Sequence, residues 1–116
     1  MPNESTIQVA ASAHFQHDLK LLVKRYRAIR RDIQPIIEQL QAGELPGDQV
    51  PGIGYSIFKV RVKNSDIQKG KSGGYRLIYY LKTVEHIVLI TIYSKSDQGD
   101  IAANEIRAIV TQYEQG

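Results

Sequence analysis

Several features are missing from this chain of 116 residues, and each absence removes a class of protein. There is no cysteine, so the chain has neither a disulfide scaffold nor a thiolate metal site. No apolar run approaches the length of a membrane span, and no charged segment precedes an apolar stretch at the N-terminus. No metal-ligand spacing links the three histidines, so we expect no metal. These absences predict a soluble, cytoplasmic protein. The length of the chain predicts one domain, over residues 1–116.

Positive charge is unevenly distributed along the chain, although the net charge is only +3. The stretch 18–31 has six Lys or Arg residues and one acid, and the stretch 55–82 has seven and one. After Asp97 the balance is acidic. Clustered positive charge attracts polyanions, but it also occurs on ordinary solvated surfaces, so charge alone leaves the function open.

The stretch KGKSGGYRLIYYLK, residues 69–82, contains Gly-Lys-Ser, which is the end of a phosphate-binding P-loop motif. That motif requires a glycine five residues before Gly70, where this chain has Ser65. A P-loop also opens a helix, whereas the residues after Gly74 are aromatic and branched, as in a strand. We therefore reject a P-loop and predict a hairpin loop with a basic tip over residues 64–74.

The pattern of apolar residues predicts a small α+β protein with the order β-α-α-β-β-β-α and an antiparallel sheet packed on helices. Ser12 is the expected N-cap of a helix that runs to about Arg30. A second helix is expected from about Asp32 to Gly43, and it tolerates Pro35 only in its first turn. The stretch 43–54 is expected to be loop. The other expected elements are a strand near 6–10, strands at about 55–63, 74–82 and 86–94, and a helix at about 100–113.

Alternation along the three central strands separates apolar from basic side chains, because neighbouring residues in a strand point to opposite faces. In the last of these strands the expected apolar set is Val88, Ile90 and Ile92. If all apolar sets share one face over a single core, the opposite face has five cations, one phenol and no carboxylate: Lys59, Arg61, Lys63, Arg76, Lys95 and Tyr93. Like charges on adjacent strands repel each other, so this pattern is typical of a face that binds an external polyanion.

Three stretches together resemble one known family: residues 55–63, GKSGGYRLIYY at 70–80, and LITIYSKSD at 89–97. The Phe-x-x-Asp-Leu-Lys opening of the first helix, residues 15–20, fits as well. These stretches are similar to the RelE/HigB branch of the RelE/ParE toxin superfamily, over about residues 6–110. The resemblance implies the α+β fold predicted above. It also implies a type II toxin that is a ribosome-dependent mRNA endonuclease.

The resemblance implies RNA cleavage without a metal or other cofactor, in which the ribose 2′-OH attacks the adjacent phosphate. Matched by motif, the family's functional residues fall on Lys59, Arg61, Arg76, Tyr93 and Lys95. Arginine suits the stabilisation of charge on phosphorus, because its planar fork matches phosphate oxygens. Neighbouring cations favour a neutral lysine, so Lys59 is a candidate general base. Tyr93 is a candidate acid, base or stacking group, and the sequence does not separate these roles.

The remaining cations are candidates for binding RNA, with an ordinary solvated surface as the alternative: Lys63, Lys69, Lys71, Lys24 and Arg27. The implied partners are an antitoxin encoded beside the toxin and mRNA on the ribosome, next to 16S rRNA of the A site. Two other functions stay open. One is a ParE-like toxin that poisons DNA gyrase without nuclease chemistry, and the other is an inactive relative that only binds its antitoxin.

Overall fold

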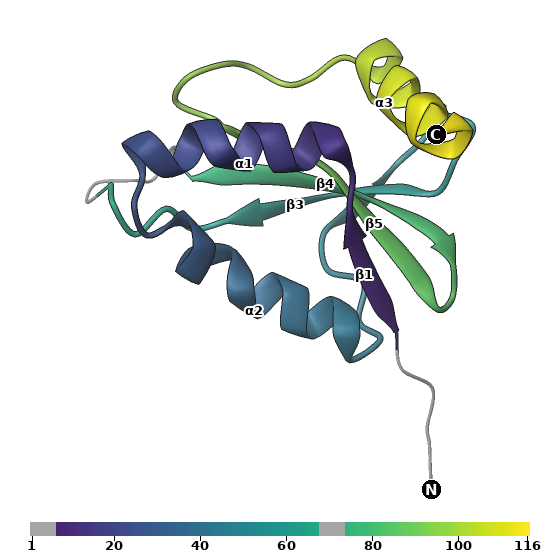
Figure 1. Ribbon diagram of the computed structural model, residues 1–116, viewed down its shortest axis with the longest axis horizontal. Helices are drawn as coiled ribbons and strands as arrows, with labels where there is room; N and C mark the ends of the chain where they lie inside the picture. The colour runs from purple at the N-terminus through teal and green to yellow at the C-terminus, as the bar shows by residue number, and fades with distance from the viewer. Residues whose placement is uncertain (1–6, 68–73) are drawn as a thin grey trace, which may run out of the picture.

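The computed structural model of the protein describes residues 7–67 and 74–116. In chain order its elements are β1 (Gln8–Ala11), α1 (Ala13–Arg25), α2 (Ile29–Gln41), β2 (Asp48–Val50), β3 (Ile57–Val62), β4 (Tyr75–Thr83), β5 (His86–Ser94) and α3 (Ala103–Gln115). The strands form one sheet in the order β1-β5-β4-β3-β2 (Figure 1). The predicted α+β class is confirmed. No helix within the described ranges is long and apolar enough to cross a membrane.

The sheet differs from the prediction at both edges. It is mixed rather than wholly antiparallel, because β1 runs parallel to β5 while the other neighbours are antiparallel. The stretch 43–54 was expected to be loop, and this is wrong for β2, which pairs with the first half of β3. Glycine and proline concealed this three-residue edge strand, because they form the turns on either side of it.

Helix α1 begins as predicted and ends earlier than predicted. The Ser12 hydroxyl accepts a hydrogen bond from the Phe15 N–H at 3.0 Å and donates one to the Ile90 carbonyl at 3.0 Å. The helix stops at Arg25 rather than Arg30, since Tyr26 leaves the helical conformation and packs edge-on against Tyr75, with ring centroids 5.7 Å apart. These contacts come from distant parts of the chain, so local periodicity did not reveal the break.

Because α1 ends early, α2 already begins at Ile29. Pro35 therefore lies inside the second turn of α2, and the expectation that it lies in the first turn is wrong. Pro35 is exposed, so water can bond the carbonyl that its missing N–H leaves without a helical partner. The helix ends as predicted at Gly43, whose positive φ of 91° suits glycine.

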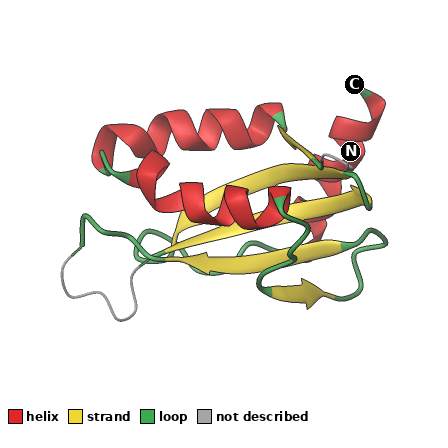
Figure 2. Cartoon of the chain, turned by 90° about the horizontal axis from the view of Figure 1, so that it is seen from below, coloured by secondary structure: helices red, strands yellow, loops and turns green. Residues whose placement is uncertain are grey.

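Both faces of the sheet are covered by helices, and each has its own apolar core. Helices α1 and α2 lie across one face (Figure 2), over a core that includes Leu77, Tyr79 and Leu89. Helix α3 packs on the opposite face, over a core that includes Ile57, Tyr80 and Ile90. The expectation of a single core is therefore wrong. The error matters for the site, because α3 and this second core lie on the face that was predicted to be cationic.

A bulge in β5 explains why simple alternation failed in this strand. Ile78 of β4 faces Thr91, whereas the next residue, Tyr79, faces Leu89, so Ile90 is an extra residue in β5. The bulge reverses the alternation, and Ile92 joins the core under α1 and α2 instead of sharing a face with Val88 and Ile90 as predicted.

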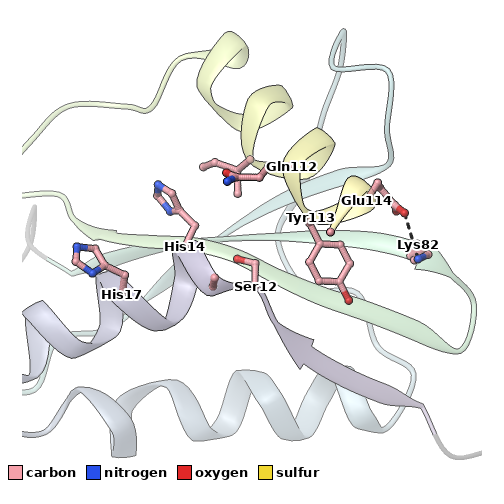
Figure 3. A pocket seen from close by; sticks show the side chains of 10 residues that line it. Ser12, His14, His17, Lys82, Gln112, Tyr113 and Glu114 are labelled. Carbon is pink, nitrogen blue, oxygen red and sulfur yellow. Dashed lines mark ion pairs between the residues drawn. The ribbon is translucent and has the colours of Figure 1, made fainter.

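The C-terminal end of α3 is fixed to the sheet by polar contacts. The Tyr80 hydroxyl donates to Glu114 Oε2 at 2.6 Å, and Lys82 Nζ lies 3.2 Å from Glu114 Oε1 (Figure 3). At the other end of α3, the Arg107 guanidinium donates to the carbonyls of Gly52 and Ile53 at 2.8 and 2.9 Å. On the same sheet face, Arg61 is exposed and Arg76 is half-buried near the start of β4, whereas Tyr80 farther along β4 is buried.

We expect Gly47→Ala to destabilise the protein through a backbone clash beside Lys59. Gly47 has a positive φ of 91°, and an added Cβ would overlap the Lys59 carbonyl oxygen. Gly52→Ala is a matched control, because its φ is also positive at 79° but its Cβ would meet no atom within 4 Å. Urea unfolding should show a loss of about 1 kcal/mol for the control and clearly more for Gly47→Ala. Equal losses would contradict the clash.

We expect the contribution of Glu114 to stability to depend on pH. The Tyr80 hydrogen bond, followed by that of Lys82, holds the pKa of the Glu114 carboxyl below its ordinary value. A lowered folded-state pKa stabilises the fold above the unfolded value, about 4.3, and that contribution is lost as the pH falls through the folded value. Urea unfolding should therefore find Glu114→Gln less stable than the native protein at pH 7, with the difference closing in acid. Glu85→Gln, in the exposed β4–β5 turn, is the control. A constant difference between pH 7 and 3 would rule out this contribution.

Candidate oxyanion-binding site

Three predicted site residues form a row across the three central strands. Arg61 of β3 lies directly opposite Arg76 of β4, and Arg76 lies directly opposite Tyr93 of β5. Residues that pair across strands share a face, so the two guanidinium-bearing side chains and the phenol emerge on the α3 side of the sheet. We call these three residues the Arg61–Arg76–Tyr93 row.

The two arginines of this row are next to each other without a neutralising acid. Within residues 7–67 and 74–116, neither has an ion pair, and the only side-chain hydrogen bond of Arg76 goes to the Tyr75 carbonyl, at 3.3 Å. Arg61 is exposed and Arg76 is half-buried. Two guanidinium groups in this arrangement repel each other, and an anion placed between them relieves the repulsion.

Tyr93 is less accessible than the sequence suggested, because it is only 5% exposed and belongs to the core that includes Ile106 of α3. Burial raises the pKa of the Tyr93 hydroxyl, so this group keeps its proton at neutral pH. Its hydroxyl still reaches the site, since it donates a hydrogen bond to Asp100 Oδ1 at 3.4 Å. Of the three roles that the sequence left open for Tyr93, its protonated state argues against that of a base.

Asp100 is a carboxylate in the site that the sequence analysis missed. Its Oδ1 lies 3.5 Å from Lys59 Nζ and 3.5 Å from Lys95 Nζ, and it also accepts the Tyr93 hydrogen bond. These four residues form the Lys59–Lys95–Tyr93–Asp100 cluster. Lys59, and then Lys95, hold the pKa of the Asp100 carboxyl below its ordinary value, so it is ionised at neutral pH.

Asp100 overturns two expectations about the sheet face. The face was expected to have no carboxylate, and Lys59 was proposed as a base because its neighbours were thought to be cations. Asp100 lies in the loop between β5 and α3, so strand alternation could not place it there. The acidic composition after Asp97 was the one signal in the sequence, and it did not indicate which acid returns to the sheet.

The predicted RNA-binding cations lie outside this cluster. Lys63 is exposed just beyond β3, and Lys24 and Arg27 are exposed at the end of α1 and just after it. Two aspartates bring these segments to one end of the molecule. Asp66 accepts a hydrogen bond from the Ala28 N–H at 2.9 Å, and Asp32 accepts one from the Ser65 N–H at 2.9 Å. Lys69 and Lys71, together with the expected tip of the hairpin, lie outside the described residues.

The Gly-Lys-Ser stretch of the rejected P-loop motif lies outside the described residues, but the residues from Gly74 onward are described. Gly74 leads directly into β4, a nine-residue strand, so no helix begins there to face a phosphate. In the described part of the chain, no three His, Asp or Glu side chains are grouped so that they could hold a metal ion. His14 instead pairs with Asp18 on α1 at 2.9 Å, and Asp18 accepts the Thr91 hydroxyl at 2.6 Å.

A hollow of about 790 Å³ lies between the start of α1 and the end of α3. It is lined by His14, His17, Lys82 and Tyr113 among others (Figure 3). Lys82 is six residues along β4 from Arg76, which is about 20 Å at the usual rise of a strand. The Lys82 side of the hollow is therefore far from the Arg61–Arg76–Tyr93 row. A neighbouring hollow of about 400 Å³ is lined by Tyr93 and shares His14, Ile109 and Gln112 with the first.

The fold and the site define a class of protein: a small α+β protein whose sheet face presents adjacent arginines, two lysines and a protonated tyrosine. A comparison with protein families makes this more specific. The model of the RelE toxin of the RelE/RelB toxin–antitoxin system matches residues 21–114. The chain belongs to the RelE toxin family, because the match covers most of its length. It is a toxin of a toxin–antitoxin system, and its partner is an antitoxin.

We expect removal of one charge from the arginine pair to leave stability unchanged or to increase it. Like charges directly opposite each other on neighbouring strands cost about 0.2–1 kcal/mol, so Arg61→Gln should recover up to that amount at low ionic strength. The gain should shrink as salt is added, because salt screens exposed charges. Arg61→Lys keeps the charge and is the control. Urea unfolding at two salt concentrations tests this, and a loss of stability in Arg61→Gln at both would show that the pair does not strain the sheet.

Proposed function

We propose that this toxin is a ribosome-dependent mRNA endonuclease that cleaves by attack of the ribose 2′-OH on the adjacent phosphate. One observation carries the proposal: Arg61 and Arg76 lie opposite each other beside the protonated Tyr93. Membership of the RelE family supports it, since toxins of this family generally cleave mRNA.

The reaction needs three functions, and the site offers a group for each. A base removes the 2′ proton as the O2′–P bond forms, the phosphorus region gains negative charge, and the departing O5′ must be protonated as the P–O5′ bond breaks. Arg61 and Arg76 are proposed to bind the phosphate oxygens at the stage when the charge on these oxygens is greatest. Tyr93 is the proposed donor to O5′, because its hydroxyl reaches the site, where it donates a hydrogen bond to Asp100 Oδ1.

Lys59 contacts the phosphate as an ammonium group and remains the candidate for the base, a role that it can take only after it has left Asp100 and lost its proton. Lys95 completes the set of cations around the phosphate. This is a modest set of acid–base groups, so the ribosome has an essential part in our proposal, because it holds the mRNA in a conformation where O2′ is in line with P–O5′. Lys24, Arg27 and Lys63 are proposed to contact ribosomal RNA or the mRNA backbone from the same end of the molecule.

We expect Arg76→Ala to abolish toxicity while antitoxin binding is retained. Loss of one group that stabilises transition-state charge lowers the rate by about 100- to 1,000-fold. Arg76→Lys keeps the charge but not the planar fork, so it should restore only part of the activity. Arg31→Ala, on the exposed surface of α2, is the control and should stay toxic. Growth after induction, mapping of mRNA 5′ ends on translating ribosomes, and co-purification with the neighbouring antitoxin provide the three readouts.

The same experiment separates the proposal from its alternatives. Intact mRNA together with trapped gyrase–DNA complexes would favour a ParE-like gyrase poison. Intact mRNA and normal growth, with the antitoxin still bound, would favour an inactive relative. Full toxicity of Arg76→Ala would show that the site is assigned wrongly.

A further inference from the structure

The Asp100 carboxylate uses a single oxygen for all of its contacts in the site. Oδ1 lies within 3.5 Å of two ammonium groups and one hydroxyl, which come from β3, from the end of β5 and from β5 itself. Two ammonium groups and a hydroxyl donor around one oxyanion are also the partners that a non-bridging phosphate oxygen requires. The Asp100 oxygen therefore stands in chemically for an oxygen of that kind.

We propose that Lys59, Lys95 and Tyr93 form a subsite for one phosphate oxygen of RNA, and that Asp100 occupies this subsite until RNA displaces it. The inference rests on the proposed function for the identity of the ligand as RNA. Asp100 thereby sets the affinity of the site, because every RNA phosphate that enters must compete with a carboxylate tethered beside the subsite.

The geometry of the loop allows this exchange. The Asp100 side chain is 60% exposed, so it can turn to solvent without leaving a buried charge behind. The side chains of Lys59 and Lys95 are 34% and 31% exposed, which leaves them reachable from outside. Three residues earlier, Asp97 holds the loop to α1 through Arg25, at 2.9 Å. A local movement of Asp100 therefore leaves the rest of the loop anchored.

A role for Asp100 as the general base fits the contacts less well. Both ammonium groups stabilise its ionised form, which makes the carboxylate a weaker proton acceptor. A fixed negative charge among the phosphate-binding groups also repels the substrate. If Asp100 competes with phosphate, its neutralisation strengthens RNA binding, whereas loss of a base or of a contact that positions the lysines has no such effect.

The test compares Asp100→Asn with Glu85→Gln, a change of the same charge in the exposed β4–β5 turn at the other end of these strands. Binding of a fluorescent, uncleavable 2′-O-methyl RNA is measured by anisotropy at several salt concentrations. One additional cation in contact with the RNA is expected to strengthen binding of Asp100→Asn about five-fold at low salt. It should also steepen the dependence of log K on log salt by about 0.7. Glu85→Gln should change the affinity less than two-fold, an order-of-magnitude limit for an unspecific charge effect.

A double variant tests the subsite itself. In a Lys59→Gln background, Asp100→Asn should give a smaller gain, because one of the two ammonium groups that the RNA phosphate would contact is absent. Thermal unfolding of every variant checks that these exposed substitutions leave the fold intact. Equal affinities for Asp100→Asn and Glu85→Gln, or weaker binding by Asp100→Asn, would overturn the proposal.

These outcomes remain distinguishable from failure of the proposed function. The binding measurement uses RNA that cannot be cleaved, so it needs no catalysis. Intact mRNA on ribosomes together with the expected difference between Asp100→Asn and Glu85→Gln would overturn the nuclease and keep the subsite. Cleaved mRNA without that difference would do the reverse.

Discussion

The register of β3, β4 and β5 is the constraint on which the rest of the site depends. Pairing places Arg61 opposite Arg76 and Arg76 opposite Tyr93, so three side chains from separate strands meet on one face. A slip of one residue in any of these strands would send its member of the row into the core under α1 and α2. The register is fixed by that core, because Leu77, Val60 and Ile92 alternate with the row and are buried. Burial of the apolar residues of the same strands therefore offsets the unfavourable energy of repulsion between the arginines.

Helix α3 covers only part of the sheet face on which Arg61, Arg76 and Tyr93 lie. Over Ile57, Tyr80, Val88 and Ile90 it closes a second core, and toward the start of β4 it leaves the arginines uncovered. Tyr93 lies at this boundary. Its ring is buried with the residues under α3 while its hydroxyl reaches Asp100, so a protonated phenol is held beside groups that attract anions. The loop that leads into α3 contains Asp100. The path of this loop therefore determines whether a negative charge lies beside Lys59 and Lys95.

Much of the fold was predictable because its local signals agree with the tertiary structure. The Ser12 cap, the Gly43 stop and the long central strands follow from short-range chemistry. The errors arose where distant contacts decide. Tyr26 ends α1 because it packs on Tyr75. Residues 48–50 form the strand β2 because they pair with β3, and the bulge at Ile90 reverses the alternation of β5. The Arg61–Arg76–Tyr93 row was nevertheless predicted, since Tyr93 lies beyond the bulge and regains its place opposite Arg76.

By itself, the sequence determined which residue types are available for chemistry and which strands present them: cations at alternate positions of β3, an arginine within β4 and a tyrosine near the end of β5. Alternation along a strand is a local property, so it can be read without coordinates. Only the tertiary structure decided that a second core lies on the same face and that Tyr93 is buried. It also brought Asp100 back from a loop to the two lysines. The physical reason is that loop direction and helix placement depend on contacts between residues far apart in the chain, which periodicity does not encode.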